Sequence, residues 1–239
     1  MIIYDITRSL NDNTPVWPGD APFRFTRNWR IADGAAVNLG SISLSVHAGT
    51  HADAPLHFQD DGRSIAELDL SVYVGRATVA TVSGCDLITV QDIVAAISTA
   101  DRGYGDASFA SEVRKSAPET TASAALALAP RLLLRTSAWQ DPATFPTQFP
   151  VIAPDVPGFL RSQGVILLGL DVPSVDLFDS KDLPNHHALH ANGIHILESL
   201  VLDGVPSGNY DLTALPLKIE GSDGSPIRAI LRYPATRPD

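Results

Sequence analysis

All seven histidines of this 239-residue chain fall in two short stretches, separated by more than half of the sequence. In the first stretch, His47, His51, Asp53 and His57 all occupy odd positions. Side chains two residues apart on an extended backbone point to the same side. One extended segment could therefore present three imidazoles and a carboxylate together. Gly49 lies inside the segment and disfavours the alternative, a helix.

Imidazole and carboxylate side chains are ligands for zinc, manganese and iron. Isolated polar residues on a solvated strand are the alternative, but four such residues in phase favour a metal site. The chain has a single cysteine, Cys85, which excludes an internal disulfide framework and any site built from several thiolates. No G-x-S-x-G motif is present, so the sequence does not indicate a serine hydrolase.

The second histidine stretch leads into Glu198, which lies among apolar residues. A buried carboxylate needs a partner or a metal, although an edge-strand or surface position is an equal alternative. The segment from Asp171 to Asp176 follows an apolar run, and α/β sites often lie at such strand ends; an ordinary turn is again an equal alternative. The remaining histidines are expected to be solvated or to lie behind the ligands: His187, His190 and His195.

The net charge of −10 argues against binding of nucleic acid or anionic membrane by bulk charge. Apolar residues make up 44% and charged residues 18% of the chain, a globular composition. We find no secretory signal pattern and no run of about 18 apolar residues. The expectation is a cytoplasmic protein without membrane spans.

The elements that must position these residues alternate irregularly between strands and a few helices. This order predicts a mixed α/β fold, in one domain over residues 1–239. The polar and then Ala/Thr-rich residues 101–129 predict a surface insertion. The other expected elements are strands at 2–7, 38–47 (half-buried, by its alternation), 77–82, 132–136, 165–170, 194–197, 210–217 and 226–232, and helices at 89–97 (with Thr89 as N-cap) and 155–162.

The run His47-x-Gly-Thr-His51-x-Asp53-x-Pro-x-His57 resembles the signature of the metal-dependent cyclase-like hydrolase family. The similarity extends over most of the chain, and residues 101–129 are its main departure. The further segments that resemble the family are Trp17-Pro18-Gly19-Asp20, Asp171-x-Pro-Ser-x-Asp176, the turn at Asn185-His186-His187, Ile196-Leu197-Glu198, Leu215-Pro216-Leu217-Lys218 and Pro226-Ile227-Arg228-Ala229.

The resemblance implies a swivelling β/β/α domain, a homodimer and two zinc ions per subunit, with manganese or another divalent metal as the alternative. Matching positions assign the first ion to His47, His51 and Asp53. Asp53 would bridge to a second ion, which His186 would also hold; by spacing alone, His187 could take that place. The remaining roles implied are contact with both ions for Glu198, general acid/base for His57 and a substrate-pocket wall for Trp17.

The loop segments resemble most closely those members that hydrolyse N-formyl-L-kynurenine to L-kynurenine and formate, a step of tryptophan catabolism. The resemblance thus implies a metal-dependent amide hydrolase acting on a small aromatic formamide. A sibling activity, such as the opening of the cyclic amide isatin, would share the same metal motif. A non-catalytic metal-binding module is the alternative from another class. His57 argues against it, because a structural site closes its coordination and needs no additional base.

Overall fold

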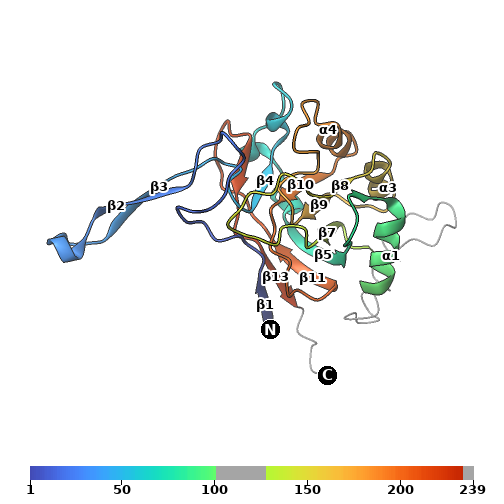
Figure 1. Ribbon diagram of the computed structural model, residues 1–239, viewed down its shortest axis with the longest axis horizontal. Coiled ribbons are helices and arrows are strands. Elements are labelled where there is room, and N and C mark those ends of the chain that lie inside the picture. The colour runs from blue at the N-terminus through green and yellow to red at the C-terminus, as the bar shows by residue number, and fades with distance from the viewer. Residues whose placement is uncertain (101–127, 234–239) are drawn as a thin grey trace.

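The computed structural model describes residues 1–100 and 128–233. Within these residues a nine-stranded mixed sheet runs in the order β1-β13-β11-β5-β7-β9-β10-β4-β12 (Figure 1). The four strands β5, β7, β9 and β10 are mutually parallel, and the flanking strands are antiparallel. The strands are β1 Ile2–Asp5, β2 Arg24–Trp29, β3 Leu39–Ser43, β4 His51–Asp53, β5 Val74–Thr81, β6 Leu87–Ile88, β7 Arg131–Arg135, β8 Val151–Ile152, β9 Leu167–Leu170, β10 His195–Glu198, β11 Gly208–Thr213, β12 Gly224–Pro226 and β13 Ile230–Tyr233.

Apolar runs form the centre of the sheet, because strands covered on both faces need apolar residues at every position. In β7, Leu133 faces one hydrophobic cluster, whereas Leu132 and Leu134 face the other. Strand β9 repeats this alternation, with Leu167 on the first face and Leu168 on the second. The sheet therefore separates two cores, and the fold is the mixed α/β domain that the sequence predicts.

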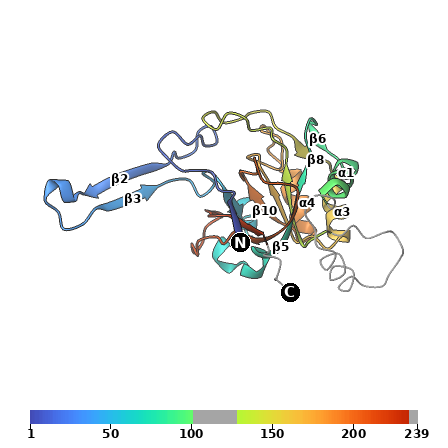
Figure 2. The same ribbon diagram turned by 90° about the horizontal axis from the view of Figure 1, so that it is seen from below.

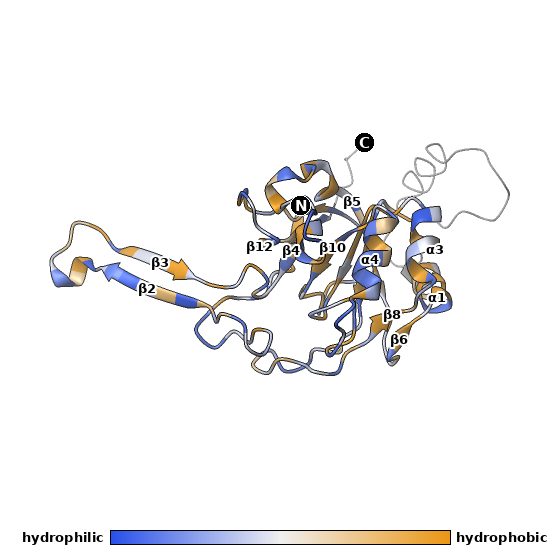
Figure 3. Ribbon diagram, turned by 90° about the horizontal axis from the view of Figure 1, so that it is seen from above, coloured by the Kyte–Doolittle hydropathy of each residue, from blue (hydrophilic) through white to orange (hydrophobic). Residues whose placement is uncertain are grey.

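In the described part of the chain, the helices on one face of the sheet are α1 Val90–Ala100, α3 Val156–Ser162 and α4 Pro184–Ala191 (Figure 3). Helix α1 begins as predicted, since the backbone N–H of Asp92 bonds to the Thr89 hydroxyl, and Asp92 Oδ2 accepts from the Thr89 N–H. Ile93 of α1 and Leu160 of α3 pack in the hydrophobic cluster between the helices and the sheet. Helix α4 differs from the turn expected at residues 185–187, and its Leu189 joins the same core.

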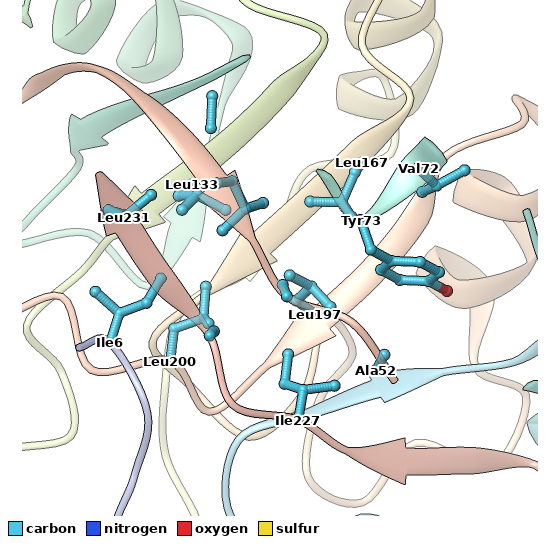
Figure 4. Packing of buried hydrophobic residues seen from close by; sticks show 14 of the residues in the cluster. Ile6, Ala52, Val72, Tyr73, Leu133, Leu167, Leu197, Leu200, Ile227 and Leu231 are labelled. Atoms are coloured by element: carbon cyan, nitrogen blue, oxygen red, sulfur yellow. The ribbon is translucent and has the colours of Figure 1, made fainter. Parts of the chain in front are cut away.

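Loops and short 3-10 turns pack against the other face of the sheet, where the residues shown in Figure 4 belong to a second hydrophobic cluster. Tyr73 and Leu200 are fully buried there, against Leu133 and Leu197 of the sheet. This second core lies under β4 and β10, the strands that carry the candidate metal ligands. Its rigidity therefore bears directly on the geometry of the site.

Strands β2 and β3 form a two-stranded arm that projects from the body (Figure 2). Every residue of both strands is exposed, so the expected half-buried strand at residues 38–47 is wrong in its burial and its length. The alternation of Ile42 with serines is real, but none of the described residues forms a layer over the apolar face, and Ile42 is 60% exposed.

Residues 101–127 of the expected insertion lie outside the described residues. Leu128 and Ala129, which end it, are buried beside the start of β7. Among the residues that are described, no helix is both long and apolar enough to span a membrane.

Candidate metal centre

Strand β4 places His51 and Asp53 on the same side, two residues apart. Its antiparallel neighbour β10 pairs Glu198 directly opposite His51. Directly paired residues have their side chains on the same face of a sheet. The strand register thus brings Glu198, from 147 positions further along the chain, beside the first histidine motif.

His47 reaches the same place by a turn, so the prediction of one extended segment over residues 47–57 is wrong. The backbone turns between Val46 and Thr50, with Gly49 at a φ of +68°. A side chain at Gly49 would be strained in this conformation and would meet the packed Leu10. Gly224 of β12 leaves room for the ring, because a Cβ there would lie 2.7 Å from His47 Cε1.

His186 enters from the first turn of helix α4. Asp176 accepts hydrogen bonds from the backbone N–H groups of Asn185 (2.9 Å) and His186 (3.1 Å), which are free at a helix start. The same carboxylate lies 2.7 Å from His186 Nδ1. His187 is exposed, with its ring 5.4 Å from that of Phe58, whereas His186 is buried.

The carboxylate of Asp53 lies between three imidazoles. Its Oδ1 is 3.1 Å from His47 Nδ1 and 3.4 Å from His51 Nε2, and its Oδ2 is 3.6 Å from His186 Nε2. Glu198 faces two of the same rings, with Oε2 3.4 Å from His51 Nε2 and Oε1 3.6 Å from His186 Nε2. Each carboxylate therefore turns one oxygen to His51 and the other to His186.

These spacings fit metal ligands. Donors each about 2.0–2.1 Å from a tetrahedral ion lie about 3.3–3.4 Å from one another, and the separations here run from 3.1 to 3.6 Å. Both oxygens of Asp53 are buried without a hydrogen-bond partner among the described residues, which is rare for a native carboxylate. The atoms of His51, Asp53 and Glu198 lie close enough together to share one ion, as do those of His47, Asp53 and His57.

The three histidines that face Asp53 each have their other ring nitrogen held by an acceptor. His51 Nδ1 donates to the Gly49 carbonyl at 2.8 Å, His186 Nδ1 faces Asp176, and His47 Nε2 lies 3.0 Å from Asp223 Oδ2. Such partners fix the tautomer of metal-binding histidines and turn the lone pair of the remaining nitrogen toward the metal.

The charges of the histidines and carboxylates in the site depend strongly on one another. Burial alone would lower the pKa of His51 and of His186, but neighbouring carboxylates outweigh it and raise both pKa values to about 10. Burial favours the protonated form of Asp53, yet His186, His47 and His51 hold its pKa well below the usual range. Burial and the charge of Asp53 raise the pKa of Glu198. The imidazoles thus supply positive charge that a bound cation would replace.

His57 lies at the edge of this group, on a 3-10 turn that follows β4. Its ring is 4.1 Å from that of His47 and 5.8 Å from that of His186. Its Nδ1 lies 3.5 Å from Asp223 Oδ2. Burial, together with the charges of His47 and His186, lowers the pKa of His57 against the opposing pull of Asp53 and Asp223. The lowered pKa favours the neutral imidazole, which is the form that can accept a proton.

A cavity of about 370 Å³ opens onto these residues. His51, His186 and Glu198, all buried, form its inner end, and Trp17 lines it, as do Trp139 and Phe145. The structure therefore brings every expected site residue to one cavity or its edge: Trp17, His47, His51, Asp53, His57, His186 and Glu198.

Sequence reasoning missed several residues of the site. Asp223 lies 176 positions from His47, and no spacing rule connects the two. Asp176 belongs to a segment that the sequence singles out, but its bond to His186 was not predicted. Trp139 and Phe145 come from a loop without a motif. The run Asp223-Gly224-Ser225 was the signal available, since it lies between the two resembling C-terminal segments.

The family model described as "Putative cyclase" matches residues 4–177 of the chain. The chain belongs to this family. The set of His, Asp and Glu donors supports a divalent metal at the site.

Two curated relatives, from Geobacillus thermodenitrificans strain NG80-2 and Bacillus cereus strain ATCC 14579, are named kynurenine formamidase. They are 42% and 40% identical to this chain over 228 residues, which cover 95% of this chain and 96% of each relative.

Solved structures share the fold. One, described as a potential metal-dependent hydrolase with cyclase activity, has a TM-score of 0.72 and 26% identity, with coverage of 98% of this chain and 99% of its own. Isatin hydrolase A from Labrenzia aggregata, bound to benzyl benzoate, has a TM-score of 0.71 and 25% identity, with coverage of 96% and 93%.

Metal uptake by the metal-free protein is expected to release protons. At pH 8, His51 and His186 each carry an extra proton, because their pKa values are about 10, and a metal binds only neutral imidazole. Full loading should release about two protons per chain, and the metal affinity should rise with pH up to about 10. Calorimetry of zinc binding in two buffers of different ionisation enthalpy measures this number. Full zinc binding without proton release at pH 8 would show that His51 and His186 are not protonated before the metal binds.

Proposed function

We propose that the protein hydrolyses N-formyl-L-kynurenine to L-kynurenine and formate, as a step of tryptophan catabolism. Its near full-length identity of 42% with a kynurenine formamidase carries the proposal. The cavity adds chemical support, since polar donors line its buried end and aromatic rings line its walls. The isatin hydrolase likeness is lower in identity and supports a shared scaffold.

The proposed metal ligands are His47, His51 and Asp53 for one zinc ion, and Asp53 and His186 for a second, with Glu198 toward both. The two oxygens of each carboxylate face different histidines, which supports a bridging arrangement. When bound, divalent metals lower the pKa of water and polarise a carbonyl. Manganese is the alternative ion for such a set of nitrogen and oxygen donors.

His57 is the proposed acid/base residue. Amide hydrolysis adds a water hydroxyl to the formyl carbon, breaks the carbon–nitrogen bond and delivers a proton to the departing arylamine. With Nδ1 turned to Asp223, Nε2 of His57 can take the proton from water and return it to that nitrogen. The neutral state that burial favours is the state needed for the first of these transfers.

Trp17 is the proposed wall for the aryl ring. Its indole is stacked on Phe178 at 5.0 Å with 23° between the planes, so its orientation is fixed before substrate arrives. The backbone N–H of Asp20 donates to the Trp17 carbonyl at 2.9 Å and closes the turn that presents the ring. Asp20 itself lines the cavity and is exposed.

The direct test measures metal content and turnover on the same purified sample. We expect about two zinc ions per chain and efficient hydrolysis of N-formyl-L-kynurenine, followed by the absorbance of the product, with much weaker opening of isatin. Preference for isatin would assign the sibling activity. Tightly bound metal with no hydrolysis of any formyl arylamine would assign the non-catalytic module.

Two substitutions separate proton transfer from metal binding. His57→Ala should keep the zinc content and lose activity by about 10²–10⁴-fold, the usual contribution of a positioned acid/base. Asp53→Ala should lose both ions, because the proposed bridge is removed. Metal analysis and turnover are measured for both variants. A His57→Ala enzyme of nearly normal activity would refute the acid/base role, and one lacking zinc would make His57 a ligand.

The projecting arm supports a homodimer. Its exposed apolar side chains include Trp29, 56% exposed, and Ile42, and an isolated two-stranded ribbon is at best marginally stable in water. The segment 24–43 carries three arginines and one aspartate, in a chain with a net charge of −10. A basic apolar arm suits the acidic body of a second copy.

The mass in solution, measured by light scattering, should be that of two chains. The double variant Trp29→Ser with Ile42→Ser removes apolar contacts from the arm and should shift the protein toward the monomer. Leu217→Ser, at a similarly exposed leucine outside the arm, serves as the control and should remain dimeric. A monomeric wild-type protein at micromolar concentration would contradict the proposal.

A further inference from the structure

Trp139 separates two cavities. It lines the metal cavity together with Trp17 and Phe145, and it also lines a neighbouring cavity of about 660 Å³ that contains Arg8. Trp139 is buried, with only 7% of its surface exposed. Arg8 lines the second cavity and not the first, so the indole stands between this cation and the candidate metal centre.

Arg8 is placed against the indole. Its guanidinium carbon lies 3.6 Å from the centroid of the Trp139 ring, well within the distance at which a cation is attracted to an aromatic face. Its buried Nε has no hydrogen-bond partner among the described residues. Burial lowers the pKa of Arg8 to about 10, against the opposing charges of Asp171 and Asp203, so the group is still a cation at neutral pH. The stacking contact is the most direct interaction that the structure gives this guanidinium.

The indole of Trp139 is held by hydrogen bonds in the plane of its ring, in addition to the contact of Arg8 with its face. Its Nε1–H is shared between the carbonyls of Asp141 and Thr144, each at 3.0 Å. Phe145 packs edge to face with it at 5.7 Å, and also with Trp17 at 5.4 Å. Trp17 is supported from behind by Phe178, and Trp139 by Arg8. Two indoles of fixed orientation therefore line the same cavity, and Phe145 packs against both of them.

We propose that Trp139 determines specificity for a flat aryl group on the scissile amide, and that Arg8 is the positioning residue that holds it. This inference rests on the proposed function of the same site. A flat ring gains from aromatic surfaces that are already oriented, since no side-chain freedom is lost on binding. A saturated ring of the same size fills the space but lacks the aromatic contact.

The competing explanation is that Trp139 only anchors its loop. A loop anchor affects stability and every ligand equally, whereas an aryl-binding wall discriminates flat from saturated rings. A residue that takes part in the chemical step would behave differently from both, because its loss would lower kcat. A wall for the aryl group changes KM and binding, and leaves kcat nearly constant.

The test measures binding to the zinc-loaded protein by calorimetry. The flat probe is acetophenone, the aryl ketone part of the expected product, and the saturated probe is 1-cyclohexylethanone, which is likewise uncharged. The variants are Trp139→Leu, Trp139→Phe, Arg8→Met and Arg8→Lys. Arg232→Met, at an exposed arginine of β13, is the matched control for loss of one guanidinium.

We expect Trp139→Leu and Arg8→Met to weaken binding of the flat probe roughly 3- to 10-fold and to leave the saturated probe within about twofold. Trp139→Phe and Arg8→Lys, which keep a ring and a cation, should recover part of the loss. KM for N-formyl-L-kynurenine should rise by a similar factor, with kcat within about twofold. Arg232→Met should match the wild type.

Equal weakening of both probes, or no weakening of either, would overturn the proposal. If Trp139→Leu does not fold, Trp139→Phe and Arg8→Met still provide the comparison. The binding measurement also separates this inference from the proposed function. The wild-type protein could bind the flat probe through Trp139 and yet hydrolyse no N-formyl-L-kynurenine. That result would refute the proposed function but support the role of Trp139 in binding the aryl group.

Discussion

Two buried carboxylates, Asp53 and Glu198, share one small volume between strands β4 and β10. Like charges in a medium of low polarity repel strongly, and each charge alone is costly to bury. The surrounding residues answer this constraint. Three imidazoles face the carboxylates, and each is oriented by an acceptor behind it. The arrangement is balanced only when positive charge lies between the two carboxylates, either as protons on histidine or as divalent ions.

The rest of the fold keeps that volume in register. Helix α4 starts where Asp176 binds its first N–H groups, so one carboxylate both begins the helix and aims His186. Leu197 of β10 and Ala52 of β4 are paired across the two strands, and both side chains are buried in the core beneath them. This packing supports the pairing of the two strands. A centre whose donors are spaced within a few tenths of an ångström depends on such rigid support.

The sequence predicted a set of residues that the structure brings together, but partly through the wrong backbone geometry. The odd positions of His47, His51 and Asp53 suggested one extended strand, and only His51 and Asp53 lie on one. The turn at Gly49 was not foreseen, because a glycine reads equally as a bulge or a turn. Strands of the sheet centre were predictable, since continuous apolar runs at residues 132–136 and 165–170 leave few alternatives. Asp223 and the pairing of Arg8 with Trp139 depend on tertiary contacts, which local patterns do not encode.

Strand β4 lies between β10 and β12 in the sheet, and its partners follow it by some 140 to 170 residues along the chain. A nascent chain emerging from the ribosome therefore has the histidine motif long before Glu198, and Glu198 before Asp223. The early segment can offer at most a partial, loosely held set of donors during synthesis. The full set of donors exists only after Asp223 has been synthesised, so a metal ion that needs all of them can be held firmly only from that point on.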